Sequence, residues 1–105
     1  MRIIELDGAN WKAPLEFLEA LYEGIEQGHP HGLGIDAFVD SMIWRGMGGV
    51  EPPYAIRIVN VGSAPKAVTD EIVATSLAIR EARRERLSWD GVDVEVTISC
   101  PELSL

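Results

Sequence analysis

Apolar residues recur along this chain at two spacings, one typical of strands and one typical of helices. Short apolar runs over residues 2–6 and 54–61 predict two β-strands, and alternation of apolar and polar residues over 92–99 predicts a third. Steps of three and four residues over 14–27 and 69–87 predict two amphipathic helices. Because helices separate the strands, the pattern favours an α/β fold with a small parallel sheet made by right-handed crossovers.

A third, shorter helix is predicted within residues 31–43, after a glycine-rich lead. Asp36 and Asp40 lie four residues apart, so their carboxylates share one face of this helix. Like charges at that spacing cost about 0.2–0.5 kcal/mol, and no lysine or arginine within a turn compensates them. This acidic face is therefore the first candidate functional feature. The apolar positions of the same helix are Ile35, Phe38, Val39 and Met42.

The helix over 14–27 is expected to begin at Pro14 and to stop at Gly28. Its glutamates follow the apolar steps one residue later, which indicates a solvated flank rather than a site. The expected packing stripe consists of Leu15, Phe17, Leu18, Leu21, Tyr22 and Ile25, and the flank consists of Glu16, Glu19, Glu23 and Glu26.

The helix over 69–87 has Thr69 as its expected N-cap. Its arginine-rich end complements the negative end of the helix dipole, which is a sufficient structural reason for those arginines. Glu81 and Glu85 repeat the spacing of the two aspartates, and a turn is expected over 89–91. The expected packing face consists of Val68, Ile72, Val73, Ser76, Leu77, Ile79 and Ala82.

Length and composition indicate a single globular domain over residues 1–105. The chain has 47% hydrophobic residues and 25% charged residues, and its start has no apolar segment typical of a secretory signal. No apolar run is long enough to span a bilayer, so we expect a soluble, cytoplasmic protein that does not bind membranes. The single cysteine, Cys100, excludes an internal disulfide and is expected to be a small residue at the end of a strand.

The net charge of −8 is concentrated in one part of the chain. Residues 13–44 contain six acidic residues and no lysine or arginine. Such a surface repels nucleic acid and acidic lipid, so direct nucleic-acid binding is not expected. It would attract a basic protein, although acidic residues also serve simply to keep a small protein in solution.

No cofactor or metal ion is expected. The pair formed by His29 and His31 lacks further ligands at suitable spacing and is better explained as a turn fixed by Pro30. The glycine-rich loop over 46–49 lacks the Lys-Ser/Thr ending of a phosphate-binding loop and does not follow a strand.

Three places in the sequence resemble the barstar family, the intracellular inhibitors of barnase-like ribonucleases. The segment Gly32-x-x-Ile35-Asp36-Ala37-Phe38-x-Asp40 is similar to the family's glycine-led "LDALWD" helix. Pro53 stands where that family has a proline before its central strand, and the run over 80–82 matches the "REA" of its last helix. The order of the elements and the final strand over 92–99 agree as well.

The resemblance implies a barstar-like α/β fold, with a small three-stranded parallel sheet packed against three to four helices and a cis peptide bond before Pro53. It also implies that the chain is an immunity protein of a toxin–antitoxin kind, which blocks the active site of a basic ribonuclease or related toxin nuclease. Asp40 would be the central acid that replaces a substrate phosphate, with Asp36 beside it. Glu81 and Glu85 would correspond to acids that reach the rim of the enzyme.

The same resemblance marks where this chain differs from the family. His31, Gly34 and Val39 stand where the family has a tyrosine, an asparagine and a tryptophan, so a different target would be recognised through these positions. The complete expected partner-binding surface consists of His31, Gly34, Ile35, Asp36, Val39, Asp40, Ile43, Trp44, Glu81 and Glu85.

Two other functions are compatible with the same residues. An acidic adaptor or nucleic-acid mimic for another basic partner uses the same charge and needs no nuclease. A small enzyme would use Asp36, Asp40 and His31 for acid–base chemistry, but the chain offers no placed nucleophile, so we expect no enzyme. A pocket lined by carboxylates would favour the enzyme, whereas an exposed carboxylate ridge would favour a binding protein.

Overall fold

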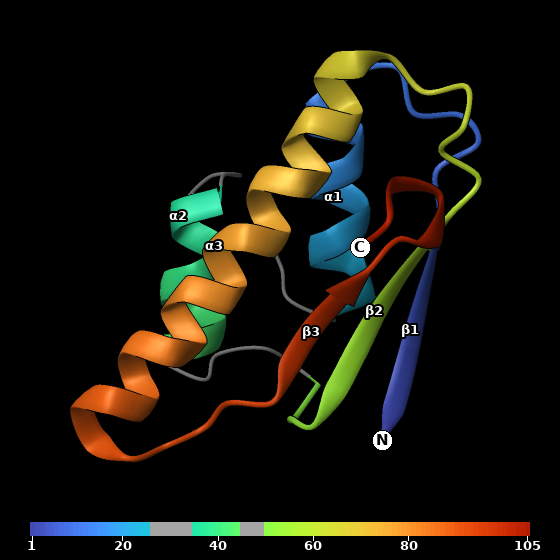
Figure 1. Ribbon diagram of the computed structural model, residues 1–105. Helices are drawn as coiled ribbons and strands as arrows, with labels where there is room; N and C mark the ends of the chain where they lie inside the picture. Colours follow the sequence, from blue (N-terminus) through green and yellow to red (C-terminus); the bar gives the residue numbers. More distant parts are fainter. Residues whose placement is uncertain (26–34, 45–49) are drawn as a thin grey trace.

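The computed structural model describes residues 1–25, 35–44 and 50–105 (Figure 1). Strands and helices follow one another in the predicted order, strand, helix, helix, strand, helix, strand. The elements are β1 (Arg2–Asp7), α1 (Pro14–Gly24), α2 (Ile35–Val39), the π-helical turn η1 (Asp40–Trp44), β2 (Tyr54–Val59), α3 (Lys66–Asp90), β3 (Val96–Ser99) and the 3₁₀ turn η2 (Pro101–Leu103).

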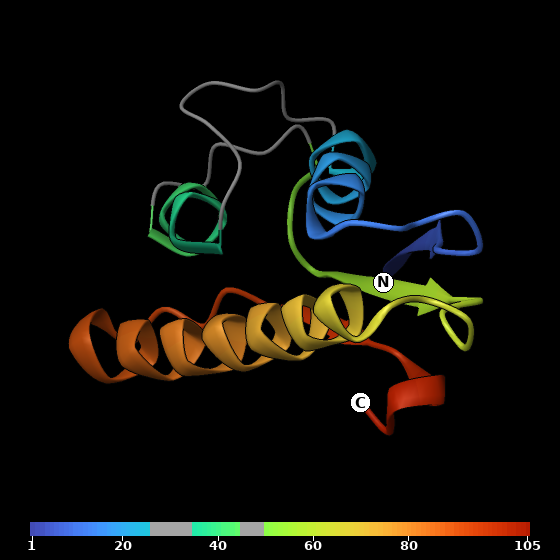
Figure 2. The same ribbon diagram turned by 90° about the horizontal axis from the view of Figure 1, so that it is seen from above.

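The three strands form a parallel sheet in the order β1-β2-β3, which confirms the predicted parallel α/β fold. Ile4, Ile56 and Ile98 are register partners across the sheet, and all three side chains are buried. Figures 1 and 2 show α1, α2 and α3 on the same side of this sheet. The alternate positions face away from the helices, and Ile3 and Arg57 are exposed there.

The packing stripes differ from the predicted ones at Leu15 in α1 and at Val73, Thr75 and Leu77 in α3, where Val73 is only half-buried. Leu15 of α1 is 51% exposed, whereas Phe17 packs into the core as predicted and lies 5.4 Å from Trp11, ring centroid to ring centroid. Leu77 of α3 is 52% exposed, whereas Thr75 is fully buried. The Thr75 hydroxyl donates a hydrogen bond to the carbonyl of Glu71 at 2.7 Å, which satisfies its polar group inside the core.

Helix α3 is longer than predicted at both ends. It begins at Lys66 with Pro65 as its N-cap, so Thr69 lies inside the helix and its hydroxyl donates to the Lys66 carbonyl at 3.1 Å. It continues through the expected turn to Asp90 and stops at Gly91, whose φ of 77° suits glycine. The arginines expected at its end are therefore not in its last turn, and the explanation from the helix dipole is wrong.

Strands β2 and β3 are shorter than predicted. β3 begins at Val96, the register partner of Tyr54, because residues 92 and 93 are bound to α3 instead of to the sheet. Val92 N–H donates to Asp90 Oδ1 at 3.0 Å, and the Asp93 carboxylate pairs with Arg83. The peptide bond between Pro52 and Pro53 is cis, as the family resemblance implied. Helix α1 ends at Gly24, and the predicted stop at Gly28 lies outside the described residues.

Candidate functional site

The segment formed by α2 and η1 is fixed to the core by its apolar side chains. Phe38 is fully buried and makes an edge-to-face contact with Tyr22, at 5.9 Å between ring centroids. Met42 is also buried, one helical turn later. Because these residues face inward, Asp36 and Asp40 are left exposed on another side of the segment.

Helix α3 supplies the second side of the site. Its residues Glu81 and Glu85 are exposed and lie one turn apart. Ala78 and Ala82 lie on the side of α3 that faces the α2–η1 segment, and their small side chains let the two helical elements approach. The resulting open groove of about 390 Å³, which we call the acidic groove, is lined by Asp36, Val39, Asp40, Trp44, Ala78, Glu81, Ala82 and Glu85.

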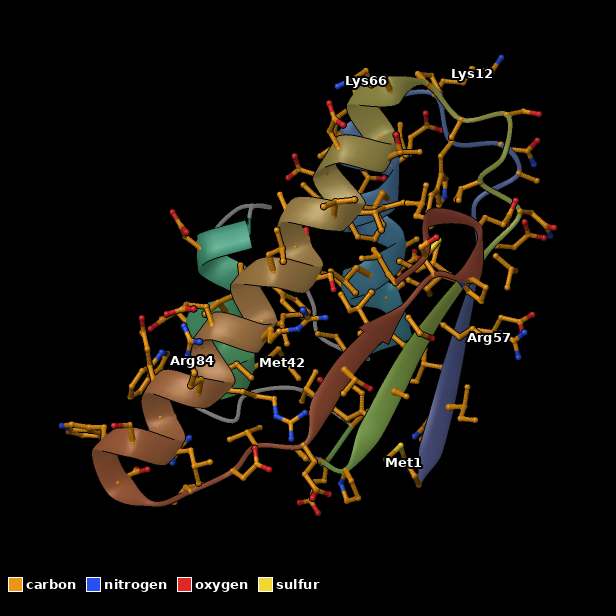
Figure 3. All side chains as sticks on the ribbon, viewed as in Figure 1. Met1, Lys12, Met42, Arg57, Lys66 and Arg84 are labelled. Carbon is orange, nitrogen blue, oxygen red and sulfur yellow. The ribbon has the colours of Figure 1, made fainter. Side chains whose placement is uncertain are left out.

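The groove carries two carboxylates on each side, and one arginine lies at its border. Arg84 hydrogen-bonds to Glu81, and Figure 3 shows Arg84 on the part of α3 that runs beside α2 and η1. The hydrogen bond and the charge of Arg84 lower the pKa of Glu81. Since the lining residues comprise four acids and no basic residue, the groove remains acidic.

The end of the groove at Trp44 is held by contacts between η1 and the last turns of α3. The Arg86 guanidinium donates a hydrogen bond to the carbonyl oxygen of Ile43. The rings of Trp44 and Trp89 meet edge to face at 5.6 Å. These two contacts fix the π-helical turn that carries Asp40, and such turns are frequent at functional sites.

The structure brings together most of the predicted partner-binding residues, with one correction. Ile43 is fully buried, so its side chain holds η1 to the core and does not line the groove. His31 and Gly34 lie outside the described residues, and Ile35 is described only as the first residue of α2. The predicted residues that line the groove are Asp36, Val39, Asp40, Trp44, Glu81 and Glu85.

Trp89 is the residue that the sequence analysis missed. It was expected in a turn, but it lies in the last turn of α3 and is 75% exposed. A large aromatic side chain that is exposed beside a charged groove is typical of a protein-binding surface. The helix's extension past residue 87 is what places Trp89 against Trp44, and that extension was not predicted.

The described residues offer little support for a metal site, a reactive thiol or a membrane-spanning helix. They contain no group of three or more His, Cys, Asp or Glu residues arranged to hold a metal ion, and His29 and His31 lie outside them. Cys100 follows β3 and is fully buried, and burial raises the pKa of its thiol. Within the same ranges, no helix is both long and apolar enough to cross a bilayer.

Comparisons with protein-family models, with curated proteins and with solved structures found no match to this chain. Its function is therefore inferred from the acidic groove and from the residues that hold the groove in place.

Proposed function

We propose that this protein is a barstar-like inhibitor that blocks the active site of a basic ribonuclease or related toxin nuclease with its acidic groove. One observation carries the proposal. Two pairs of carboxylates that are distant in sequence, Asp36 with Asp40 and Glu81 with Glu85, line the same open surface. Arg84 relieves part of the repulsion between these like charges through Glu81, and a cationic partner would relieve it further.

The groove suits a nuclease because such enzymes bind the phosphates of RNA through arginine, lysine and histidine side chains. Carboxylates on both sides of the groove can pair with several separate cations of a nuclease, as the consecutive phosphates of RNA do. Asp40 lies on η1 between Asp36 and Trp44 in the chain, and it is the proposed central acid. Glu81 and Glu85 on α3 would then contact the rim of the enzyme's active site.

Apolar contacts extend the proposed interface beyond the four acids. Val39 and Trp44 line the groove, and Trp89 stands exposed next to Trp44. Aromatic residues that bury large area on binding often dominate affinity, while charged groups set the association rate and the choice of partner. The acids are therefore proposed to select a basic enzyme, and the tryptophans to hold it.

The family resemblance supports the same proposal. The glycine-led helix that carries Asp36 and Asp40, the three parallel strands in sequence order and the cis bond before Pro53 all agree with the barstar pattern. Val39 stands where the family has a tryptophan, so the exposed ring of Trp89 offers aromatic area from another element.

The test is a pull-down from secreted proteins at low and high salt, followed by a ribonuclease assay on the captured protein. We expect capture of a basic nuclease whose RNA cleavage is abolished at equal molar amounts of this protein. Capture should weaken as salt rises, because the Debye length falls from about 10 Å at 0.1 M to about 3 Å at 1 M.

Matched variants make the test specific for the groove. The double variant Asp36→Asn/Asp40→Asn should lose inhibition, whereas Glu19→Gln/Glu23→Gln should keep it. The control removes the same charge at the same spacing from exposed positions of α1. Capture of a basic protein without nuclease activity would instead support an acidic adaptor, and equal effects of the two double variants would contradict a role for the groove.

A further inference from the structure

The flank of α3 that faces β3 forms a second concave surface, a pocket of about 350 Å³. Three arginines line it, Arg80, Arg83 and Arg84, and its apolar wall includes Ile79, Leu87 and Ile98. We call it the arginine pocket. Its volume falls within the range of about 300–1,000 Å³ that is typical of small-molecule sites.

The role that the sequence suggested for these arginines does not apply. Helix α3 continues to Asp90, and its last turn contains no basic residue. The three arginines therefore lie too early in the helix to stabilise its negative end, because that effect is confined to the last turn. Arg83 and Arg84 pair with Asp93 and Glu81, whereas the position of Arg80 beside them needs another explanation.

The charge of the pocket is opposite to that of the molecule. Three of the chain's 9 lysine and arginine residues line it, together with the acidic Asp93, whereas the whole chain has a net charge of −8. Glu81 pairs with Arg84 and the charge of Glu95 acts on Arg83, so Arg80 contributes most of the charge left for a ligand. An anion would therefore be attracted to this pocket and repelled by most of the remaining surface.

The pocket already binds one carboxylate, which belongs to the chain itself. Arg83 Nε and Nη2 donate to the two oxygens of Asp93 at 2.9 and 2.8 Å, the paired geometry in which a guanidinium recognises a planar carboxylate. Arg80 is exposed, and the Arg84 side chain is 73% exposed. Arg84 gives an Nη2 donor to Glu81, and a guanidinium has five N–H donors, so both arginines can present donors to a second carboxylate. Leu87, 50% exposed, offers apolar contact beside them.

We propose that the arginine pocket binds a small organic anion in which a carboxylate is attached to an apolar body. The carboxylate pairs with Arg80 and Arg84, and the apolar body lies against Leu87 and Ile98. Inorganic phosphate lacks the apolar body, so it fits only the arginines. The proposal does not rest on the proposed function, but the two surfaces share a border, because Arg84 lines the arginine pocket and hydrogen-bonds to Glu81 of the acidic groove.

The direct test is a titration of the ¹⁵N-labelled protein, followed by NMR. The probes are 4-phenylbutyrate, its neutral analogue 4-phenylbutyramide, and inorganic phosphate. We expect saturable shifts of the Thr97 and Ile98 amides and of the Arg80 side-chain Nε–H with 4-phenylbutyrate, with a Kd on the order of millimolar or tighter. The amide and phosphate should each bind at least about fivefold more weakly, since each lacks one half of the recognised chemistry.

A peptide probe then identifies the source of the carboxylate. An N-acetylated Val-Phe dipeptide with a free C-terminus that binds more tightly than 4-phenylbutyrate would assign the pocket to peptide C-termini. Tighter binding of 4-phenylbutyrate would assign it to free organic acids. Binding of either probe at the pocket supports the proposal, and binding of neither overturns it.

Charge-matched variants decide whether the arginines of the pocket are responsible. Arg80→Gln/Arg84→Gln should weaken 4-phenylbutyrate binding about fivefold or more, whereas Arg57→Gln/Lys66→Gln should leave it unchanged. Arg57 lies on the far side of the sheet and Lys66 at the opposite end of α3 (Figure 3). Equal weakening by both double variants would show general charge attraction and would overturn the proposal. Tighter or equal binding of the neutral amide would overturn it as well.

Discussion

The two flanks of α3 differ in charge although they share one short sequence. Residues 80–86 read Arg-Glu-Ala-Arg-Arg-Glu-Arg, a mixed run with no evident pattern of sign. A helix turns by about 100° per residue, which places Glu81 and Glu85 beside α2 and η1 and places Arg80 and Arg83 beside β3. A mixed run of charges on a helix can therefore build two surfaces of opposite sign.

The flanks also differ in how they are held. The acidic groove depends on a short segment that is fixed by core side chains such as Phe38 and by the contacts of Trp44 and Arg86 with α3. The arginine pocket lies between the longest helix and the sheet, with Asp93 pinned to Arg83. The acidic side is therefore expected to be the first to lose its structure when the core is weakened.

The largest effect is expected from Phe38→Ala. Removal of this fully buried ring from its contact with Tyr22 should lower the free energy of unfolding by about 3–5 kcal/mol, measured by urea unfolding. Val39→Ala, at a half-buried position of the same helix, should cost clearly less. Hydrogen exchange should rise first in η1 and later in β3, and the reverse order would contradict the proposed difference between the flanks.

The next effect concerns the affinity for the proposed nuclease. Asp40→Ala should weaken binding by about 2 kcal/mol or more, because a central carboxylate that pairs with several cations acts as a hot spot. Titration calorimetry with the captured enzyme measures the change, and Glu23→Ala on α1 serves as the control for lost charge. An unchanged affinity for the Asp40 variant would remove Asp40 from its proposed central place.

On the other flank, Asp93→Asn should make stability less dependent on pH. The hydrogen bonds from Arg83 lower the pKa of Asp93 below its ordinary value of 3.8. A carboxylate with a lowered pKa in the folded state stabilises the protein above its unfolded-state pKa, and this contribution is lost as the pH falls through the lower folded-state value. The variant should therefore be less stable than the natural chain at pH 7, and the difference should disappear in strong acid.

Urea unfolding over a series of pH values measures this difference. Glu51→Gln, at an exposed position before β2, is the control and should show no comparable trend. A stability difference that grew as the pH fell would contradict the assigned direction of the Asp93 pKa.

The smallest effect is expected at the border between the two flanks. Arg84→Gln should let the pKa of Glu81 rise toward its ordinary value of 4.5, because Arg84 is the group that lowers it. The association rate with a basic partner should rise about twofold at low salt and less at high salt, since salt screens these exposed charges. Arg80→Gln removes the same charge without releasing Glu81, so only the Arg84 variant should move the Glu81 pKa, followed by NMR of its carboxyl carbon.

The sequence predicted the order of elements and the parallel sheet, because hydrophobic spacing reports directly on which face of an element is buried. Ends of elements were predicted less well. β3 begins only where Tyr54 provides a partner strand, and α3 continues to Gly91, so tertiary contacts and a terminal glycine set these limits. Leu77 was placed inward for its hydrophobicity, whereas Thr75 is buried through its own hydrogen bond.

In the candidate site, too, the sequence predicted some features, while tertiary contacts set the others. Spacing alone placed Asp36 with Asp40, and Glu81 with Glu85, on common faces, but the approach of the two helical elements follows from the fold. The burial of Ile43 was not predicted, since an apolar residue at the end of a short helix suits a core and an interface equally. Trp89 was missed because its position depends on the unexpected last turn of α3.

The contact between Trp44 and Trp89 also makes the protein its own optical probe. Trp11 is buried next to Phe17, whereas Trp89 is exposed and touches the ring that lines the acidic groove. Any molecule that covers the end of the groove would change the polarity around Trp89, and its emission would move to shorter wavelength. Occupancy of the groove can thus be followed by intrinsic fluorescence, without a label and before the partner has been identified.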